Sequence, residues 1–347
     1  MDRTYLEIKD QYRALNRTLG YMTARCDELM DFYRRRQPRT LLYAGSGSSY
    51  CLCRSAALSA VLRLSIPALA FSAGDLMLNY ESYRKTLDGA MLAALSRSGK
   101  TSELIKAIRN IRAYAQMPIL AITCSGNTPL TDLADFKLEI PWADDKSVCQ
   151  TRTVVNLYAA NLIMLAYLSG DLDLLNDIKA MVCGGEVFMD RYDGILADMA
   201  CMDWNNVVIL ADGEIQGIAA EGALAFTEIA QIPGHSHCFL DVRHGPLIMI
   251  KKGTLVIACL TENGFDYQKG LIEEIRDRGA DVITYSDIVL DEIKGVKLAA
   301  ASGMKLASAV RGIPFINIAQ LLALYQAKRK GLNPDQPEGL DAWIALP

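Results

Sequence analysis

The chain has 347 residues, of which 51% are hydrophobic and 22% charged, and it carries a net charge of −4. These values are typical of a globular protein with a sizeable core, and the length predicts two domains. A slightly acidic chain without a basic block is not expected to bind nucleic acid, and no apolar run is long enough to suggest a membrane span.

The first part of the chain predicts helices followed by a strand and a glycine-rich turn. Apolar side chains recur at helical intervals over residues 3–36, which indicates one or two amphipathic helices that end before Pro38. The run from Thr40 to Ala44 predicts the first strand. Gly45-Ser46-Gly47-Ser48-Ser49 then leads into a helix over residues 50–64, and its glycines would let the backbone approach a ligand closely. A short strand at residues 67–71 and a loop over residues 72–79 follow.

A second strand, turn and helix has a composition suited to an anion. The apolar run from Ala90 to Leu95 predicts a buried strand, and apolar residues at helical spacing follow from Leu104. The turn between them is Ser96-Arg97-Ser98-Gly99-Lys100-Thr101-Ser102. The first amides of a helix lack internal partners and carry partial positive charge, so hydroxyls and cations there favour a phosphate. An ordinary capped turn has a similar composition, and this segment alone does not separate the two interpretations.

The remaining segments of this half are two strands, a polar loop and an apolar helix, predicted at Met117 to Cys124, Phe136 to Ile140, residues 144–153 and Val154 to Leu168. We interpret Asp144 and Asp145 in the loop as a solvated pair. Alternation of strands and helices predicts a parallel sheet with helices on both faces, which binds ligands at the carboxyl ends of its strands. Both glycine-rich turns and the loop at Gln150 would lie at that edge.

A second series of strands and helices follows. Its predicted strands are residues 206–211, 254–260, 281–285 and 296–299, and its helices are residues 215–232, 265–278 and 316–330. The predicted organisation is a helical extension, a first α/β domain, a helical connector and a second α/β domain with a C-terminal tail, over residues 1–37, 38–170, 171–202 and 203–347.

Few side chains outside the turns are candidates for catalysis or metal binding. The three histidines are His235, His237 and His244, and Glu228 lies on an apolar helix 16 residues before the last of them. Glu228 and His244 could act as a general base and a ring-opening acid or base, although each taken alone is more readily a structural residue. His235 and His237 have no partner at metal-ligand spacing, and no Cys-x-x-Cys occurs, so no metal is expected. Nine scattered cysteines predict reduced thiols and a cytoplasmic location.

Taken together, five motifs resemble those of the double sugar-isomerase (SIS) domain proteins. This family includes the isomerase half of glutamine–fructose-6-phosphate aminotransferase and the tagatose-6-phosphate ketose/aldose isomerase and amino-sugar-phosphate deaminase group. The motifs are Gly47-Ser48-Ser49, Ser96 to Thr101, Glu221-Gly222-Ala223-Leu224 with Glu228, Arg243-His244-Gly245-Pro246, and Gln320-Leu321-Leu322-Ala323 with Gly331 to Pro337. Each motif alone is only weakly specific, but the occurrence of all five in the same order along nearly the whole chain is specific to the family.

The resemblance implies two tandem SIS domains, each with a parallel flavodoxin-like sheet between helices. It implies that the sugar phosphate is bound by Ser49, Ser96, Arg97, Ser98 and Thr101, and that the sugar is lined by Gly47, Ser48, Val148, Gln150 and Thr151. It implies that Glu228 moves a proton between C1 and C2 without a cofactor. It also implies a homodimer, in which His244 opens the sugar ring in the neighbouring subunit's site.

Three departures from the synthase pattern bear on the activity that we expect. Ala225 and Ala342 stand where the family has lysines, and Gln150 stands where it has a serine. Residues 1–37 are also too short for a glutaminase domain. We therefore expect aldose–ketose isomerisation of a hexose or hexosamine 6-phosphate, with or without release of ammonia, rather than synthesis. The alternatives are a fructosamine-6-phosphate deglycase and a non-catalytic regulator that binds a sugar phosphate.

Overall fold

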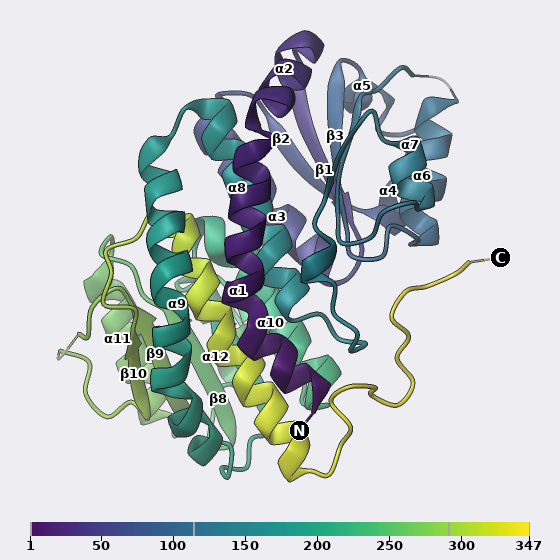
Figure 1. Ribbon diagram of the computed structural model, residues 1–347. Coiled ribbons are helices and arrows are strands. Elements are labelled where there is room, and N and C mark those ends of the chain that lie inside the picture. The colour runs from purple at the N-terminus through teal and green to yellow at the C-terminus, as the bar shows by residue number, and fades with distance from the viewer. Residues whose placement is uncertain (1, 114, 291, 347) are drawn as a thin grey trace. The chain divides into compact units, whose positions relative to one another are not determined.

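The computed structural model describes residues 2–113, 115–290 and 292–346. The chain divides into two compact units, each built on one five-stranded sheet (Figure 1). The first-sheet unit comprises Asp10–Val182 and Asp341–Pro347, and the second-sheet unit comprises Met1–Lys9 and Cys183–Leu340. All strand pairs in both sheets are parallel, which confirms the predicted α/β class.

The first sheet has the strand order β2-β1-β3-β4-β5, so β3 lies at its centre. Its strands are β1 Thr40–Gly45, β2 Ala68–Ser72, β3 Ala90–Ser96, β4 Ile119–Thr123 and β5 Phe136–Glu139. The helices before and between the strands are α1 Arg3–Ala24, α2 Cys26–Arg36, α3 Ser48–Leu64, α4 Ala73–Asn79, α5 Arg84–Leu87, α6 Ser102–Arg112, α7 Pro129–Leu133 and the 3₁₀ turn Pro141–Ala143. Two long helices follow, α8 Arg152–Ser169 and α9 Leu172–Met199.

Alternation of side chains along the central strands builds two cores. Leu92 and Ala94 of β3 point to the face covered by α4 and α6, where Leu104 and Ile108 pack against them. On the other face α3 packs with α8. The strands are apolar on both sides because both faces are covered, and the seven residues of β3 are all buried. This burial holds the carboxyl end of β3 and the turn after it in a fixed position.

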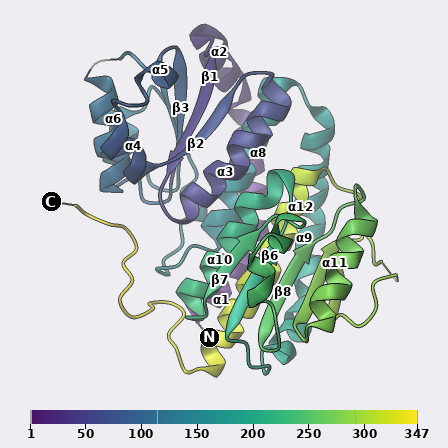
Figure 2. The ribbon, with the colours of Figure 1, turned by 180° about the vertical axis from the view of Figure 1, so that it is seen from behind.

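The second sheet has the order β10-β9-β8-β6-β7, so β8 occupies the central position that β3 has in the first. Its strands are β6 Asn206–Leu210, β7 Gly234–His237, β8 Thr254–Cys259, β9 Asp281–Ser286 and β10 Leu298–Ala301. Its helices are α10 Gln216–Ile229, α11 Phe265–Asp277 and α12 Ser308–Arg329, with 3₁₀ turns at Gly213–Ile215, Asp241–Arg243 and Pro246–Met249. Figure 2 shows α10, α11 and α12 beside these strands.

Two sequence predictions were wrong in this fold. The expected loop at residues 72–79 is largely helix α4, because Ala73 and Leu76, one turn apart, are fully buried in the core and stabilise it. The last helix begins at Ser308 rather than at residue 316, and it continues through Pro314.

Helix α12 also corrects the expectation that no segment is long and apolar enough to cross a membrane. By length and hydropathy it passes that test, but 89% of its apolar window is buried inside the protein. A helix that is apolar on all sides and enclosed by protein is the core helix of a globular unit, and we treat α12 as one.

Candidate functional site

The turn after β1 begins the candidate phosphate site. Gly47 is exposed and has a positive φ of 55°, which favours glycine. A Cβ on Gly45 would lie 2.8 Å from the carbonyl carbon of Ser49, so this position also requires glycine. Ser48 and Ser49 are the first residues of α3 and are largely buried. The two glycines therefore bring the start of α3 close to the end of β1.

The turn after β3 is shaped by its own hydroxyl groups. Ser96 Oγ accepts a hydrogen bond from the Gly99 amide at 3.0 Å, and Ser98 Oγ accepts one from the Lys100 amide at 3.2 Å. Thr101 is the N-cap residue of α6, but its side chain makes no capping hydrogen bond. Its hydroxyl is therefore not used to cap α6, at a helix start where the backbone favours negative charge.

Gly99 fixes the shape of this turn. Its φ is +62°, and a Cβ there would lie 2.3 Å from Thr128 Oγ1. Thr128 is the N-cap of α7, where it exchanges hydrogen bonds with Thr131. Gly99 also accepts a hydrogen bond from the Leu130 amide at 3.1 Å. Only glycine fits at this position between the turn from Ser96 to Thr101 and the start of α7.

Arg97 has a different place from that expected of a phosphate ligand. Its side chain is buried, and its guanidinium donates to the backbone carbonyls of Ser147 and Val148 at 3.0 Å each and to that of Ala342 at 2.7 Å. Ser147 and Val148 belong to the loop before α8, and Ala342 belongs to the C-terminal tail. Sequence reasoning missed these contacts, because a basic residue in a turn carries no signal for distant carbonyl groups.

Asp145, expected to be solvated, is buried. Its Oδ2 accepts hydrogen bonds from the amides of Thr151 at 2.7 Å and Thr153 at 3.0 Å, and its Oδ1 lies 3.7 Å from Arg152 Nε. The carboxylate thus caps the start of α8, where helix amides lack internal partners. Asp144 is partly exposed and pairs with Lys146 at 2.6 Å, so the interpretation of a solvated pair fails only for Asp145.

The loop held by Asp145 carries three of the five residues predicted to line the sugar. Val148 and Gln150 are half-buried and Thr151 is fully buried. Among the residues that the structure describes, the buried Gln150 Oε1 has no hydrogen-bond partner. A buried acceptor without a partner is costly, and a ligand hydroxyl would satisfy it.

Glu228 and His244 both belong to the second-sheet unit. Glu228 is half-buried in the last turn of α10, and His244 is exposed between two 3₁₀ turns. Gly245 beside His244 has a φ of 128°, a conformation that favours glycine. Arg243 is held by Glu274 of α11 at 3.1 Å.

The second sheet separates these two side chains. A Cβ on Gly222 of α10 would lie 2.7 Å from Ile209 Cδ1, so α10 covers the face to which Ile209 points. Val208 packs in one core with Val242 and Leu247, which flank His244. Because neighbouring residues of a strand point to opposite faces, α10 and the His244 segment lie on opposite faces of the sheet. The structure therefore does not bring Glu228 and His244 of one chain together.

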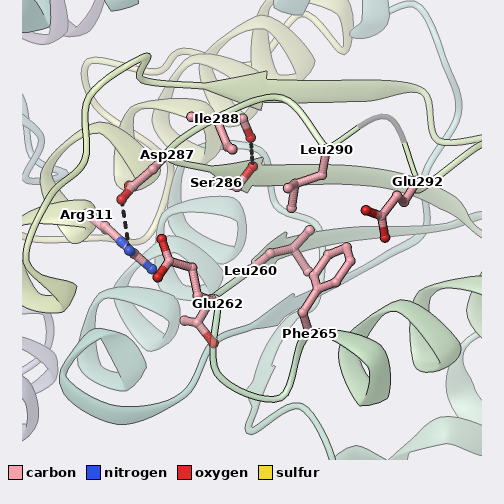
Figure 3. A pocket seen from close by; sticks show the side chains of 10 residues that line it. Leu260, Glu262, Phe265, Ser286, Asp287, Ile288, Leu290, Glu292 and Arg311 are labelled. Atoms are coloured by element: carbon pink, nitrogen blue, oxygen red, sulfur yellow. Dashed lines mark hydrogen bonds and ion pairs between the residues drawn. The ribbon is translucent and has the colours of Figure 1, made fainter.

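The carboxyl edge of the second sheet has a cavity of about 250 Å³. Its lining includes Leu260 and Phe265 after β8, Asp287 after β9, and Glu262 and Arg311, and Figure 3 shows Arg311 reaching between the two carboxylates. Arg311 is buried and pairs with Asp287 at 2.8 Å. Burial raises the pKa of the Asp287 carboxyl. This apolar and acidic cavity does not suit a phosphate.

The remaining histidines are on β7. Burial, and then the neighbouring His235, lowers the pKa of His237. Within the described residues, no group of three or more His, Cys, Asp or Glu side chains is placed to hold a metal ion. All nine cysteines are free thiols, and burial raises the pKa of the Cys53, Cys124 and Cys259 thiols.

Known proteins resemble this chain in sequence and in structure. Isomerizing glutamine–fructose-6-phosphate aminotransferase from Buchnera aphidicola is 28% identical over 266 residues, 72% of this chain and 42% of that protein. Its counterpart from Sulfurisphaera tokodaii is 24% identical over 348 residues, 98% of this chain and 56% of that protein. The chain thus spans about half the length of the curated relatives that it matches.

Two solved structures have the same fold. Tagatose-6-phosphate ketose/aldose isomerase from Escherichia coli has a TM-score of 0.86 at 21% identity, covering 99% of this chain and 97% of its own. Glucosamine-6-phosphate deaminase from Thermotoga maritima has a TM-score of 0.77 at 21% identity, covering 95% and 99%. The model of the SIS domain matches residues 36–167 and 202–327, the segments that contain the two sheets. With most of its length matched in this way, the chain belongs to the SIS domain family.

Proposed function

We propose that the protein is a sugar-phosphate aldose–ketose isomerase that acts on a hexose or hexosamine 6-phosphate, with release of ammonia where the substrate carries a 2-amino group. The observation that carries the proposal is the turn from Ser96 to Thr101. It combines hydroxyl groups, a required glycine and two cations at the start of α6, next to the central strand of a parallel sheet. Phosphate binding of this kind anchors a substrate so that its reacting carbons are oriented.

In the proposed reaction Glu228 is the general base. It removes the proton from C2 of the open-chain sugar and returns a proton to C1, so an aldose becomes a ketose through a cis-enediol. With a 2-amino sugar the same transfer gives an imine at C2, and water then replaces ammonia to leave the ketose. General acid–base catalysis of this type contributes roughly 10²–10⁴-fold to the rate.

We propose that the active form is a homodimer in which His244 of one chain opens the sugar ring bound by the other. The separation of α10 and the His244 segment by the second sheet supports this arrangement, because one chain's own Glu228 and His244 cannot face each other across it. Leu240, Ile248 and Met249 around His244 are exposed apolar side chains, as expected of a surface that a second copy covers.

Mixing two inactive variants tests the dimer. We expect Glu228→Gln and His244→Asn each to be inactive alone, and their mixture, after unfolding and refolding together, to regain up to one quarter of the wild-type activity. In a mixed dimer, one of the two sites contains both wild-type side chains. A mixture that stays inactive although mixed dimers form would overturn the shared site.

The reaction is tested by a substrate panel. The protein would be incubated with glucosamine 6-phosphate, galactosamine 6-phosphate, fructose 6-phosphate with ammonium, tagatose 6-phosphate and a fructosamine 6-phosphate, while ammonia, amine and sugar products are measured. We expect ketose formation that Glu228→Gln lowers by about 10²-fold or more. Glu273→Gln is the matched control, because Glu273 is also a half-buried helical glutamate, on α11.

Other outcomes of the panel identify the alternatives. Release of an amine and a hexose phosphate from the fructosamine 6-phosphate alone would identify a deglycase. Saturable binding of a sugar phosphate without turnover of any substrate would identify a regulator. We place the protein in the cytoplasm, and its nine free thiols support a reducing compartment.

A further inference from the structure

We propose that Arg97 is a positioning residue, which ties the C-terminal tail and the sugar-lining loop to the phosphate turn instead of binding the phosphate itself. The inference deepens the proposed function and rests on it only for the identity of the ligand. It is carried by the three carbonyl oxygens that the Arg97 guanidinium contacts, two in the loop before α8 and one in the tail.

The guanidinium is occupied by backbone groups. Nη1 donates to the carbonyls of Ser147 and Val148, and Nη2 donates to that of Ala342 at 2.7 Å. Arginine presents its donors as a rigid planar fork, so these bonds fix the side chain in one orientation. A phosphate could accept from the same N–H groups only if the tail or the loop were released.

The charge of Arg97 nevertheless remains available to an anion. Its side chain is only 6% exposed, and no carboxylate of the described residues forms an ion pair with it. A buried cation with carbonyl partners alone retains its positive field, because carbonyl dipoles do not cancel a full charge. Arg97 would therefore attract the phosphate at a distance while its N–H groups hold the loop and the tail.

The tail follows the phosphate turn over several residues. Lys100 Nζ lies 5.4 Å from the centre of the Trp343 ring, the Ser102 amide donates to the Ile344 carbonyl at 3.3 Å, and the Leu346 amide donates to Ser102 Oγ at 3.0 Å. The amide of Ser102, the first residue of α6, is thus already paired. A phosphate at this helix start therefore has to use other groups, such as the Thr101 hydroxyl.

Residues 341–346 form no helix or strand, so these side-chain and backbone contacts are what hold the tail in place. Of its anchors, Arg97 is the one that also contacts the sugar-lining loop. The loop before α8 and the tail come from distant parts of the sequence, and one buried guanidinium joins them. Loss of Arg97 should therefore free both segments at once.

The test separates charge from geometry with two substitutions. Arg97→Lys keeps the charge but cannot reach three carbonyls, and Arg97→Met removes both. Cleavage by chymotrypsin after Trp343, followed by mass spectrometry of the intact chain, reports release of the tail. Calorimetric titration with inorganic phosphate reports the anion site. Neither measurement needs the substrate, so failure of the proposed reaction would not decide this proposal.

We expect cleavage after Trp343 to become about ten-fold faster in both variants, because each lost charged hydrogen bond contributes on the order of a ten-fold change. We expect phosphate affinity to change less than about three-fold in Arg97→Lys and to fall about ten-fold or more in Arg97→Met. Arg109→Met is the control: it removes an exposed cation from α6 but leaves the contacts of the tail described above, so cleavage should change less than about three-fold.

Unchanged cleavage in Arg97→Lys would overturn the proposal. So would a ten-fold loss of phosphate affinity in Arg97→Lys, because that result would make the guanidinium a direct ligand. If Arg97→Met does not fold, Arg97→Lys alone still decides between a positioning residue and a direct phosphate ligand, since it retains the buried charge. Once a substrate is identified, a positioning role for Arg97 predicts that its substitution mainly lowers kcat, whereas a role as phosphate ligand predicts that it mainly raises KM.

Discussion

The turns that follow β3 and β8 leave the central strand of their sheets at the carboxyl edge, and each leads into a helix. In the first, serine hydroxyls accept from amides of the turn itself, and the Thr101 hydroxyl makes no capping bond to α6. In the second, Gln268 of α11 accepts from the Thr261 amide at 3.0 Å and donates to its hydroxyl at 2.9 Å. The first turn leaves the Thr101 hydroxyl without a capping bond, whereas in the second the Thr261 amide and hydroxyl are both bonded to Gln268.

The charges of the two edges differ in the same way. Arg97 and Lys100 lie in the first turn, whereas Glu262, Asp287 and Glu292 line the cavity beside the second, with Arg311 already paired to Asp287. The same arrangement of strand, turn and helix thus carries basic side chains at one edge and mainly acidic side chains at the other. The position of a turn in a parallel sheet does not by itself determine its ligand, which depends on the side chains of the turn and their hydrogen bonds.

The largest expected effect concerns the second edge. Arg311→Met removes the partner of the buried Asp287 carboxylate, and we expect the free energy of unfolding of the second-sheet unit to fall by about 3–5 kcal/mol. Urea unfolding measures this loss, and Lys305→Met controls for removal of an exposed cation nearby. Inorganic phosphate should bind the variant as it binds the wild type. A loss below about 1 kcal/mol would show that the pair is not a structural element of this edge.

Substitution of one glycine in each turn compares how tightly the two turns are packed. Gly99→Ala places a Cβ 2.3 Å from Thr128 Oγ1 at a φ of +62°. We expect the free energy of unfolding to fall by about 3 kcal/mol and the affinity for phosphate to fall as well. Gly264, at the start of α11, has a φ of +74°, but a Cβ there would be 4.0 Å from Tyr267 Cδ2. Gly264→Ala should therefore cost only the backbone strain of about 1 kcal/mol. Equal losses in thermal or urea unfolding would contradict the tighter packing of the first turn.

The sequence predicts what is local in this protein. The strands other than β7 and most of the long helices follow from apolar periodicity, whereas β7, Gly234–His237, has no apolar side chain to mark it. The turn from Ser96 to Thr101 could be proposed as a phosphate site because its residues are contiguous. Helix α4 was missed because only Ala73 and Leu76 of its seven residues are buried, which is too few to establish a period.

The contacts between distant segments could not be predicted. Asp145 has no local mark of burial, because its role depends on the amides of Thr151 and Thr153 six and eight residues away. The bond from Arg97 to Ala342 spans 245 residues, and Asp287 meets Arg311 across 24. Each of these pairs depends on how the chain folds back, so composition and spacing around one residue do not indicate its partner.

A pair of threonines tests ligand binding at the two turns. Thr101→Val removes a hydroxyl that caps nothing, so we expect phosphate affinity to fall about ten-fold with little loss of stability. Thr261→Val removes the hydroxyl that accepts from Gln268 Nε2 but keeps the amide that donates to Gln268 Oε1, so we expect stability to fall by about 1 kcal/mol with unchanged phosphate affinity. Titration calorimetry and urea unfolding of both variants complete the comparison. Loss of phosphate affinity in Thr261→Val would place an anion site at the second edge as well.

The smallest expected effect is on the pH dependence of stability at the second edge. Burial raises the pKa of Asp287 above its ordinary value of 3.8, so above that pH the native state binds more protons at this carboxyl than the unfolded state does. The contribution of Asp287 to the free energy of unfolding therefore decreases as the pH rises from about 4 through its folded pKa. In Asp287→Asn this contribution is absent. We expect the difference between wild type and Asp287→Asn to decrease over this range in urea unfolding, with Asp266→Asn as the control for loss of an exposed carboxylate on α11. A difference that grows with pH would mean that the pairing with Arg311 outweighs burial, so that the acidic edge would be held together by its ion pair and not in spite of its buried charge.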